Sequence, residues 1–526
     1  MKGIMITSPA FKRFSACRCF GLVLAVAVML IVLLGCSRTA QRKQPRLVLL
    51  YATCTVNSDY LEPYNSEVDY TPNLADFASS SVVFQRHMSE AGQSGIAYAS
   101  LVSGQQAYQH GVYYHPGKLS DDLFLIAEAF TEAGYESYYW NGHIMADINL
   151  NFGQGISPQN RILVPPVFKR SILQSGDERF QELLTRLKEE PEFRAFVLVT
   201  FSRTHAPYHK QYPVEFYEAV SERFPREFEG LTLVDAEKYW AIYEKDRRKF
   251  ECDLQSTAKM RGLDDNDVST MARVLEWTYK ANIIGLDFMF GRTLTLLREN
   301  DLLDHSMIAF TADHGETLHR ENTLLNWSHG FQLSPEVLRV PWILYSPMHK
   351  LRTGGYEGVT RSIDVFPTLA GLCGIDLSQH ELEGRDLSPA LLGEEKPPHL
   401  VAFYHTSAVH AELHLPDFLR SETLKRYFGS ADVSVIWVGS RDGDTTYKLR
   451  NLDGDNWGMQ VFNVSEDPKE SVNRFDSENS AHIRMKEALE DYKSLLVSRY
   501  GKTDSPDVPF EDAMRRLQSL GYVGGN

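Results

Sequence analysis

An aspartate and two histidines in this chain could bind a metal ion and an anion. Asp313 and His314 are adjacent, and His329 follows shortly after them. The apolar run over 307–310 predicts a buried strand that ends in a turn at the Asp-His pair. Side chains at the carboxyl end of such a strand commonly face a ligand, and a carboxylate beside an imidazole can hold a divalent metal ion. Taken alone, such a pair is more often a turn aspartate and a structural histidine.

The elements that must position this pair alternate between strands and helices. Short apolar runs predict strands over 46–51, 136–140, 196–201, 307–311 and 340–345. Helical spacing between these runs predicts helices, of which the last, over 274–297, leads into the strand before Asp313. The alternation predicts an α/β fold with a mainly parallel central sheet.

Composition excludes one class of partner. The chain has 526 residues and a formal net charge of −15, with the acidic excess spread along its length. A nucleic-acid surface needs clustered Lys and Arg to contact phosphates, so no nucleic-acid partner is expected. A local metal ion could still hold an anionic substrate.

The N-terminus has the pattern of a targeting segment. Basic residues precede an apolar run over 20–34, and Gly35-Cys36 follows it. The pattern resembles the bacterial lipoprotein signal, which implies that 1–36 is a signal and anchor segment and 37–45 a tether. A lipidated Cys36 would hold the protein at a membrane of the bacterial cell envelope, on the periplasmic side or the outer surface. The alternative is an uncleaved single-span anchor.

Two other regions differ in texture from the predicted main domain, 46–398. Residues 209–270 are charged, aromatic and helical in pattern. They could cover the site as a lid or recognition insert, or form a solvated hairpin with no role in binding. In 399–526, short β-rich runs separated by Gly/Asp turns precede a charged helix, which predicts a small antiparallel-sheet subdomain.

Sequence motifs in a fixed order resemble those of the sulfatase family of the alkaline phosphatase superfamily. The resemblance implies a three-layer α/β sandwich with a central mixed, mainly parallel sheet. The matching segments are 70–77 (YTPNLADF), 100–104 (SLVSG), 110–112 (HGV), 205–208 (HAPY), 313–316 (DHGE), 329–330 (HG), 336–341 (EVLRVP), 362–369 (SIDVFPTL), 382–387 (LEGRDL) and 520–524 (LGYVG).

The resemblance assigns roles to particular residues. Counting back from Gly104 places Ser94 at the position of the nucleophile. Asp313, His314 and Ser94 would hold one divalent metal ion. His205 and His329 would be catalytic and would face the transferring oxygens or the leaving group, and His143 is a weaker candidate for substrate contact.

The chain departs from the family pattern at three points. The nucleophile segment 94–98 lacks the Pro and Arg that formylglycine-forming enzymes read, so Ser94 is expected to stay a serine. Cys54 stands where the first strand should end in a metal-binding Asp; a thiolate suits zinc and suits calcium badly, so zinc is the first expectation, with manganese or calcium as alternatives. Asn141 and Gln105 replace the usual anion-binding Lys and Arg, and Arg203 could substitute for them.

These residues leave three hypotheses open. The first is a metal-dependent hydrolase of sulfate or phosphate esters, which would act on a sulfated or phosphorylated glycan, lipid or small molecule. An unmodified serine favours phosphoryl chemistry, whereas the family favours sulfate. The second is an inactive relative that uses the fold for binding or scaffolding, and the third is an envelope phosphotransferase.

Overall fold

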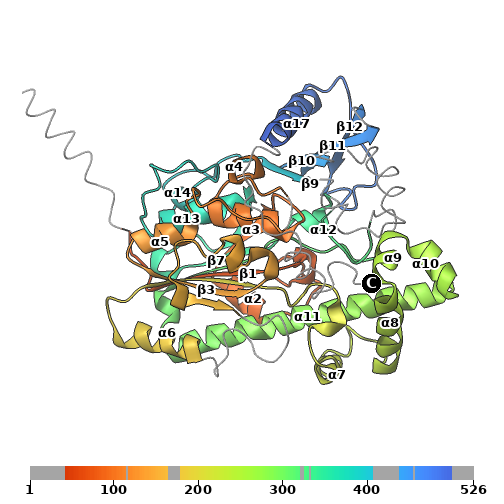
Figure 1. Ribbon diagram of the computed structural model, residues 1–526, viewed down its shortest axis with the longest axis horizontal. Coiled ribbons are helices and arrows are strands. Elements are labelled where there is room, and N and C mark those ends of the chain that lie inside the picture. Colours follow the sequence, from red (N-terminus) through yellow and green to blue (C-terminus); the bar gives the residue numbers. More distant parts are fainter. Residues whose placement is uncertain are drawn as a thin grey trace, which may run out of the picture. The chain divides into compact units, whose positions relative to one another are not determined.

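The computed structural model describes residues 42–113, 116–163, 178–319, 325–330, 333–406, 437–453 and 456–499 (Figure 1). The chain divides into two units, Met1–Lys43 and Gln44–Asn526, and every helix and strand below belongs to the second. Cys36, most of the expected leader and tether, and the 520–524 motif lie outside the described residues. No helix within the described ranges is long and apolar enough to cross a membrane.

A mixed, mainly parallel sheet of eight strands forms the centre of the fold. The strand order is β4-β3-β5-β1-β6-β7-β2-β8. Only β7 runs antiparallel to its two neighbours, β6 and β2, and the other adjacent pairs are parallel. The strands are β1 (Leu47–Thr53), β2 (Val82–Met88), β3 (Glu136–Gly142), β4 (Arg161–Leu163), β5 (Ala195–Phe201), β6 (Ser306–Ala312), β7 (Trp342–Tyr345) and β8 (Gly354–Arg361).

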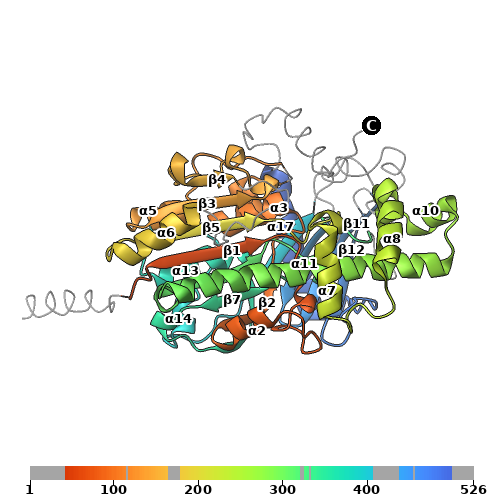
Figure 2. The same ribbon diagram turned by 90° about the horizontal axis from the view of Figure 1, so that it is seen from below.

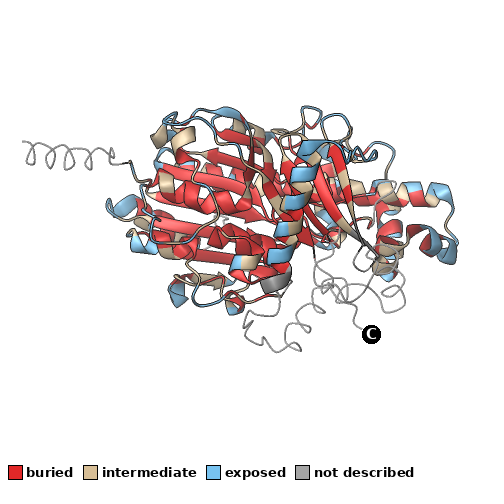
Figure 3. Cartoon of the chain, turned by 90° about the horizontal axis from the view of Figure 1, so that it is seen from above, coloured by how far each residue is buried: buried red, intermediate tan, exposed pale blue. Residues whose placement is uncertain are grey.

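The sheet is the middle of three layers because its central strands are apolar on both faces. In β1, alternate residues project to opposite sides, so Leu49 and Tyr51 join one hydrophobic core while Leu50 and Ala52 join the other. Figures 2 and 3 show the helices on the two faces and the buried strands between them. One core receives α2 (Pro72–Ser79), α6 (Glu178–Glu189) and α11 (Asp265–Glu299); the other receives α3 (Ser94–Ser103), α5 (Ile126–Glu132) and α13 (Val365–Leu372).

The segment expected to be a helical insert is indeed helical. It lies between β5 and β6 and includes the first turn of α11, and the rest of α11 returns the chain to β6. We call this segment, 209–270, the helical insert. Its helices are α7 (Val214–Arg223), α8 (Leu233–Lys245), α9 (Arg247–Cys252), α10 (Leu254–Arg261) and the first turn of α11.

A second, antiparallel sheet of four strands follows the main domain, as the sequence predicts. Its order is β12-β11-β10-β9. The strands are β9 (Ala402–Thr406), β10 (Trp437–Asp442), β11 (Thr445–Asp453) and β12 (Asn456–Asn463), and the helix is α17 (Ser480–Arg499). Three short helices complete the α-helices of the described residues: α4 (Ala107–His110), α12 (Pro335–Leu338) and α14 (Ser388–Leu391).

Candidate metal centre and active site

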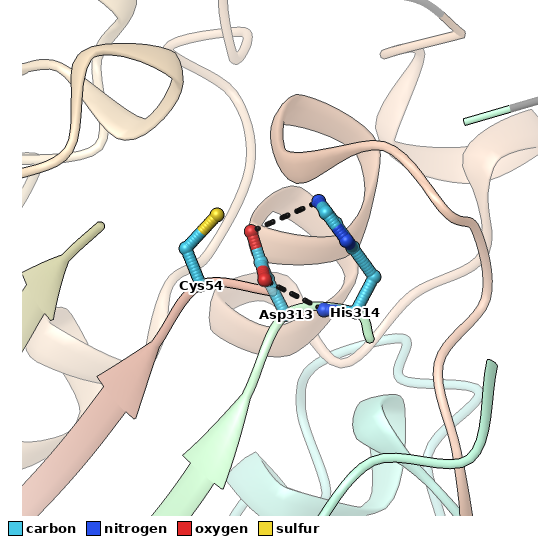
Figure 4. Close-up of side chains that lie close together, drawn as sticks. All are labelled: Cys54, Asp313 and His314. Carbon is cyan, nitrogen blue, oxygen red and sulfur yellow. Dashed lines mark hydrogen bonds and ion pairs between the residues drawn. The ribbon is translucent and has the colours of Figure 1, made fainter. Parts of the chain in front are cut away.

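The parallel pairing of β1 and β6 brings Cys54 and Asp313 together. Thr53 is paired with Ala312 at the last position of the two strands, and the Asp313 amide continues the ladder by donating to Thr53 O at 2.9 Å. Cys54 and Asp313 therefore leave adjacent strands side by side at their carboxyl ends, as Figure 4 shows. Asp313 Oδ1 accepts the amides of Thr55 and His314 at 3.1 and 2.6 Å. These two bonds fix the carboxylate.

The backbone at Gly315 explains why a glycine follows the Asp-His pair. The Gly315 amide donates to Val337 O at 2.6 Å, and a Cβ at this position would lie 2.0 Å from Glu336 O. Any side chain would push the turn away from α12. Glycine thus lets the turn pack closely enough to aim Asp313 and His314 at one point.

One ring nitrogen of His314 is left as an acceptor. His314 Nδ1 lies 2.8 Å from the carbonyl oxygen of Gly315, which can only accept, so Nδ1 carries the proton. In the neutral ring, Nε2 then presents its lone pair to Ser94 Oγ at 3.0 Å and to Asp313 Oδ2 at 3.5 Å. The lone pairs of Nε2 and Asp313 Oδ2 repel each other at 3.5 Å, unless a proton on Nε2 or a shared cation lies between these two atoms.

Four donor atoms converge at this point. Cys54 Sγ lies 3.7 Å from Ser94 Oγ, and the ligand atoms of Cys54, Asp313 and His314 all lie within 4.8 Å of one another. Asp313 Oδ2 is buried and accepts no hydrogen bond within the described part of the chain. Zinc–ligand bonds of about 2.0–2.3 Å separate tetrahedral ligands by about 3.3–3.8 Å, so small side-chain shifts would let the set hold one metal ion. We call Cys54, Ser94, Asp313 and His314 the donor cluster.

The donor cluster is buried, and this sets the state of its thiol. The four side chains are at most 1% exposed. Burial, reinforced by the negative charge of Asp313, raises the pKa of the Cys54 thiol well above its ordinary value. Without a cation the thiol stays protonated, and a bound metal ion would displace that proton.

His329 and His205 lie beside the donor cluster. The His329 ring is 4.3 Å from the His314 ring and 4.8 Å from the His205 ring, measured between centroids. Glu316 Oε1 lies 3.1 Å from His329 Nδ1, which leaves Nε2 of His329 for other contacts. Burial raises the pKa of Glu316 and lowers the pKa of His205. His329 and His205 thus follow one another away from His314. We call these two residues the histidine row.

His143 approaches the cluster from β3 with a buried donor. Its Nδ1 accepts the Met145 amide at 3.1 Å, so Nε2 carries the proton, and Nε2 has no hydrogen-bond partner in the described ranges. Burial lowers the pKa of His143 to about 4; the charge of Asp313 acts in the opposite direction and His314 in the same one. A neutral imidazole N–H in such a place is suited to bind an oxygen of an anion.

The positions that lack the family's cations have structural contacts instead. Asn141 Oδ1 accepts the His143 amide at 2.8 Å and the Thr200 hydroxyl at 3.1 Å. Tyr98 is fully buried, with its ring 5.1 Å from that of His143. Arg203 donates to Gln211 O at 3.0 Å and lies over the Tyr212 ring. These contacts direct Arg203 to the start of the helical insert, and its role in substrate binding stays a prediction.

The structure therefore brings Cys54, Ser94, Asp313 and His314 to one point. It places the remaining candidate histidines, His143, His205 and His329, around that point. Sequence reasoning gave no role to two further groups, Glu316 and Arg247. Glu316 is within the DHGE motif, which was the sequence signal that could have marked it. Only the structure shows that it is buried beside His329. Arg247 of α9 acts on the pKa of both His205 and Glu316, and no motif marks it.

This geometry defines an α/β protein of the alkaline-phosphatase type with a metal-donor cluster at the strand ends, a fold that typically binds a divalent metal ion. The sulfatase family model matches residues 48–375. The chain belongs to the sulfatase family.

Individual relatives agree with the family assignment. Bovine arylsulfatase A (Bos taurus) is 31% identical over 224 residues, a stretch that spans 41% of this chain and 41% of the relative. Two solved structures share the fold. A protein in complex with its substrate D-glucosamine-2-N,6-O-disulfate has a TM-score of 0.60 at 17% identity, covering 89% of this chain and all of the other. The phosphonate monoester hydrolase of Agrobacterium radiobacter has a TM-score of 0.57 at 19% identity, covering 87% and 96%.

Proposed function

We propose that the protein is a metal-dependent hydrolase of sulfate or phosphate esters with Ser94 as its nucleophile. The observation that carries the proposal is the convergence of a thiol, a hydroxyl, a carboxylate and an imidazole lone pair on one buried point. The family and its relatives support the reaction class, which is ester hydrolysis at sulfur or phosphorus. An anionic ester is therefore the substrate class.

Ser94 is placed to attack the ester. It begins α3, a ten-residue helix whose N-terminal partial charge favours an anion at Oγ. Its hydroxyl lies 3.0 Å from His314 Nε2. A divalent ion held by the donor cluster would lower the pKa of that hydroxyl and offset the charge of the transferring group.

The histidine row is placed to handle the leaving group. As the bond from sulfur or phosphorus to the ester oxygen breaks, that oxygen must gain a proton. His205 or His329 can give it in the imidazolium form, which the negative charge of a bound anion favours. Glu316 holds the His329 ring through Nδ1. His143 can donate a hydrogen bond from Nε2 to a non-bridging oxygen. Water then cleaves the seryl ester and regenerates the Ser94 hydroxyl.

The donor set favours zinc, because a thiolate and an imidazole are ligands that zinc prefers to the oxygen-only sets of calcium. Manganese and calcium are the alternatives. An unmodified serine suits phosphoryl transfer, so a phosphorylated glycan, lipid or small molecule is proposed alongside the sulfated substrates typical of the family.

A substrate and metal screen tests the proposal. Aryl sulfates, phosphate mono- and diesters and phosphonates are offered to the full-length protein with added zinc, manganese or calcium, beside Ser94→Ala. Hydrolysis that disappears in Ser94→Ala supports the assignment, and hydrolysis that survives it removes the nucleophile. No hydrolysis with any metal ion would favour a binding or scaffolding protein, or an envelope phosphotransferase if an acceptor alcohol restores turnover. The mass of the peptide that contains Ser94 shows whether the serine is unmodified.

We also propose that the protein acts in the bacterial cell envelope, anchored by a lipid on Cys36. The support is the basic and apolar pattern of residues 1–35 followed by Cys36. Metabolic labelling with a radioactive fatty acid should mark the wild-type chain and not Cys36→Ser. Equal labelling of both, or a chain that keeps its leader, would contradict the anchor.

A further inference from the structure

The helical insert binds the loop that carries His205. Glu244 of α8 holds the first two residues of the insert, which directly follow this loop: it accepts from His209 Nε2 at 3.1 Å and pairs with Lys210. Tyr217 of α7 donates its hydroxyl to Tyr208 O at 2.6 Å. Gln211, at the start of the insert, donates to His205 O at 2.7 Å. The insert therefore holds this loop at the carbonyl oxygens of His205 and Tyr208.

The same insert binds the loop that carries His329. The Asn326 amide donates to Glu251 O of α9 at 3.0 Å, and the Tyr243 ring of α8 meets the Trp327 ring edge-to-face at 5.6 Å. Trp327 is fully buried and has a left-handed backbone, with φ of +49°. A large residue rarely adopts that conformation, so the surrounding packing must hold it. His329 follows two residues later.

The contacts to the two loops are joined inside the insert. Tyr243 and Glu244 are neighbours on α8, and the Tyr243 hydroxyl donates to Glu251 Oε1 at 3.1 Å. Glu251 is 3% exposed and pairs with Arg247 and Arg248. A displacement of α8 would therefore move the His205 loop through Glu244 and the His329 loop through Tyr243. The His205 and His329 rings are 4.8 Å apart, and the positions of the two loops set that distance.

We propose that the helical insert is a positioning element for both histidines, with Tyr243 and Glu244 as its positioning residues. The inference rests on the proposed function, in which these histidines protonate the leaving oxygen. It assigns a task to a segment that sequence alone leaves as either a lid or a solvated hairpin. The insert would fix the position from which the proton is delivered. Disturbing the insert should therefore lower kcat most for esters with poor leaving groups.

The test uses Tyr243→Phe and Glu244→Gln, with Tyr239→Phe as the matched control. Tyr239 is also on α8, and its hydroxyl donates to Asp267 at 2.8 Å, away from both loops. An alkyl ester and a 4-nitrophenyl ester are compared, of whichever acid the wild-type protein cleaves. We expect kcat to fall about 10-fold for the alkyl ester and less than about 2-fold for the 4-nitrophenyl ester, because only the poor leaving group needs the proton. KM should change little.

Equal losses for the two esters, or the same pattern in Tyr239→Phe, would overturn the proposal. Histidine NMR of the zinc-loaded full chain, labelled at Cε1 and assigned with His205→Gln and His329→Gln, gives a readout without substrate. Both test variants should shift the His205 and His329 signals, and the control should not. Shifted signals in a protein that cleaves no ester would uphold the positioning role and reject the proposed function. Unshifted signals in an active protein would do the reverse.

Discussion

The donor cluster and the histidine row are held in place by different means. Cys54 and Asp313 leave two paired strands, and Ser94 begins a helix packed on the same sheet, so backbone hydrogen bonds of the core fix them. His205 and His329 lie on loops that other parts of the chain hold. Because the supports differ, we expect that a substitution can abolish proton delivery while metal binding is kept, and the reverse.

The largest effect is expected at the nucleophile. Ser94→Ala should lower kcat by about 10³-fold or more, since the covalent step loses its attacking atom. Cys54, Asp313 and His314 remain, so the variant should still bind metal. Steady-state kinetics and metal analysis of the same sample give the two values. A variant that loses metal completely while folding normally would mean that Ser94 is chiefly a ligand.

Removing a histidine of the row should cost less and leave the metal in place. His329→Gln and His205→Gln are each expected to lower kcat by about 10²-fold for alkyl esters, because general-acid catalysis is lost. Metal content should match the wild type, as neither side chain belongs to the donor cluster. Metal loss in either variant would show that the histidine row also supports metal binding, so that the donor cluster and the row do not act separately.

Thr406 of the C-terminal subdomain contacts the loop that carries His329. The Thr406 hydroxyl of β9 donates to Gly330 O at 2.8 Å, next to His329. Thr406→Val keeps the shape and removes this bond, so kcat should fall about 3- to 10-fold through misplacement of His329. Thr445→Val, in β11 of the same sheet, is the control. Equal kcat in both variants would show that the bond does not position the loop.

The smallest effect concerns stability, at the buried Glu90 between β2 and α3. Glu90 lies four residues before Ser94, and burial raises its pKa to about 8. Its unfolded value is about 4.3, so between these values the folded state keeps a proton that the unfolded state has lost. The free energy of unfolding should therefore decrease with rising pH, by at most about 1.4 kcal/mol per pH unit from this group.

Glu90→Gln keeps the shape and cannot ionise, which makes the pH effect measurable. The Tm of Glu90→Gln minus that of the wild type should grow from pH 5 to pH 8 in calorimetry. Exposed Glu67→Gln should show no such trend. If the Tm difference between Glu90→Gln and the wild type stays constant from pH 5 to pH 8, Glu90 is not the group whose ionisation changes the stability.

The same contrast explains what the sequence could predict. Apolar runs were enough for β1, β3, β5, β6 and β7, because strands buried on both faces leave a strong local pattern. The sequence analysis did not predict β2, β4 and β8, which contain half-buried or exposed residues that interrupt the apolar pattern. Alignment through the motifs was enough for the donor cluster, including Cys54 in place of an aspartate. Local pattern cannot reveal contacts between residues far apart in the chain. Glu251 with Asn326, Tyr243 with Trp327 and Thr406 with Gly330 were for that reason invisible.

The central claim is that Cys54, Ser94, Asp313 and His314 hold one metal ion. Zinc-edge X-ray absorption of the zinc-loaded protein tests it most directly, together with the metal content. We expect about one zinc per chain with one sulfur neighbour at about 2.3 Å and lighter neighbours at about 2.0 Å. In Cys54→Ser the sulfur neighbour should vanish. Less than about 0.2 metal per chain with zinc, manganese or calcium supplied, or bound zinc without a sulfur neighbour, would contradict the account.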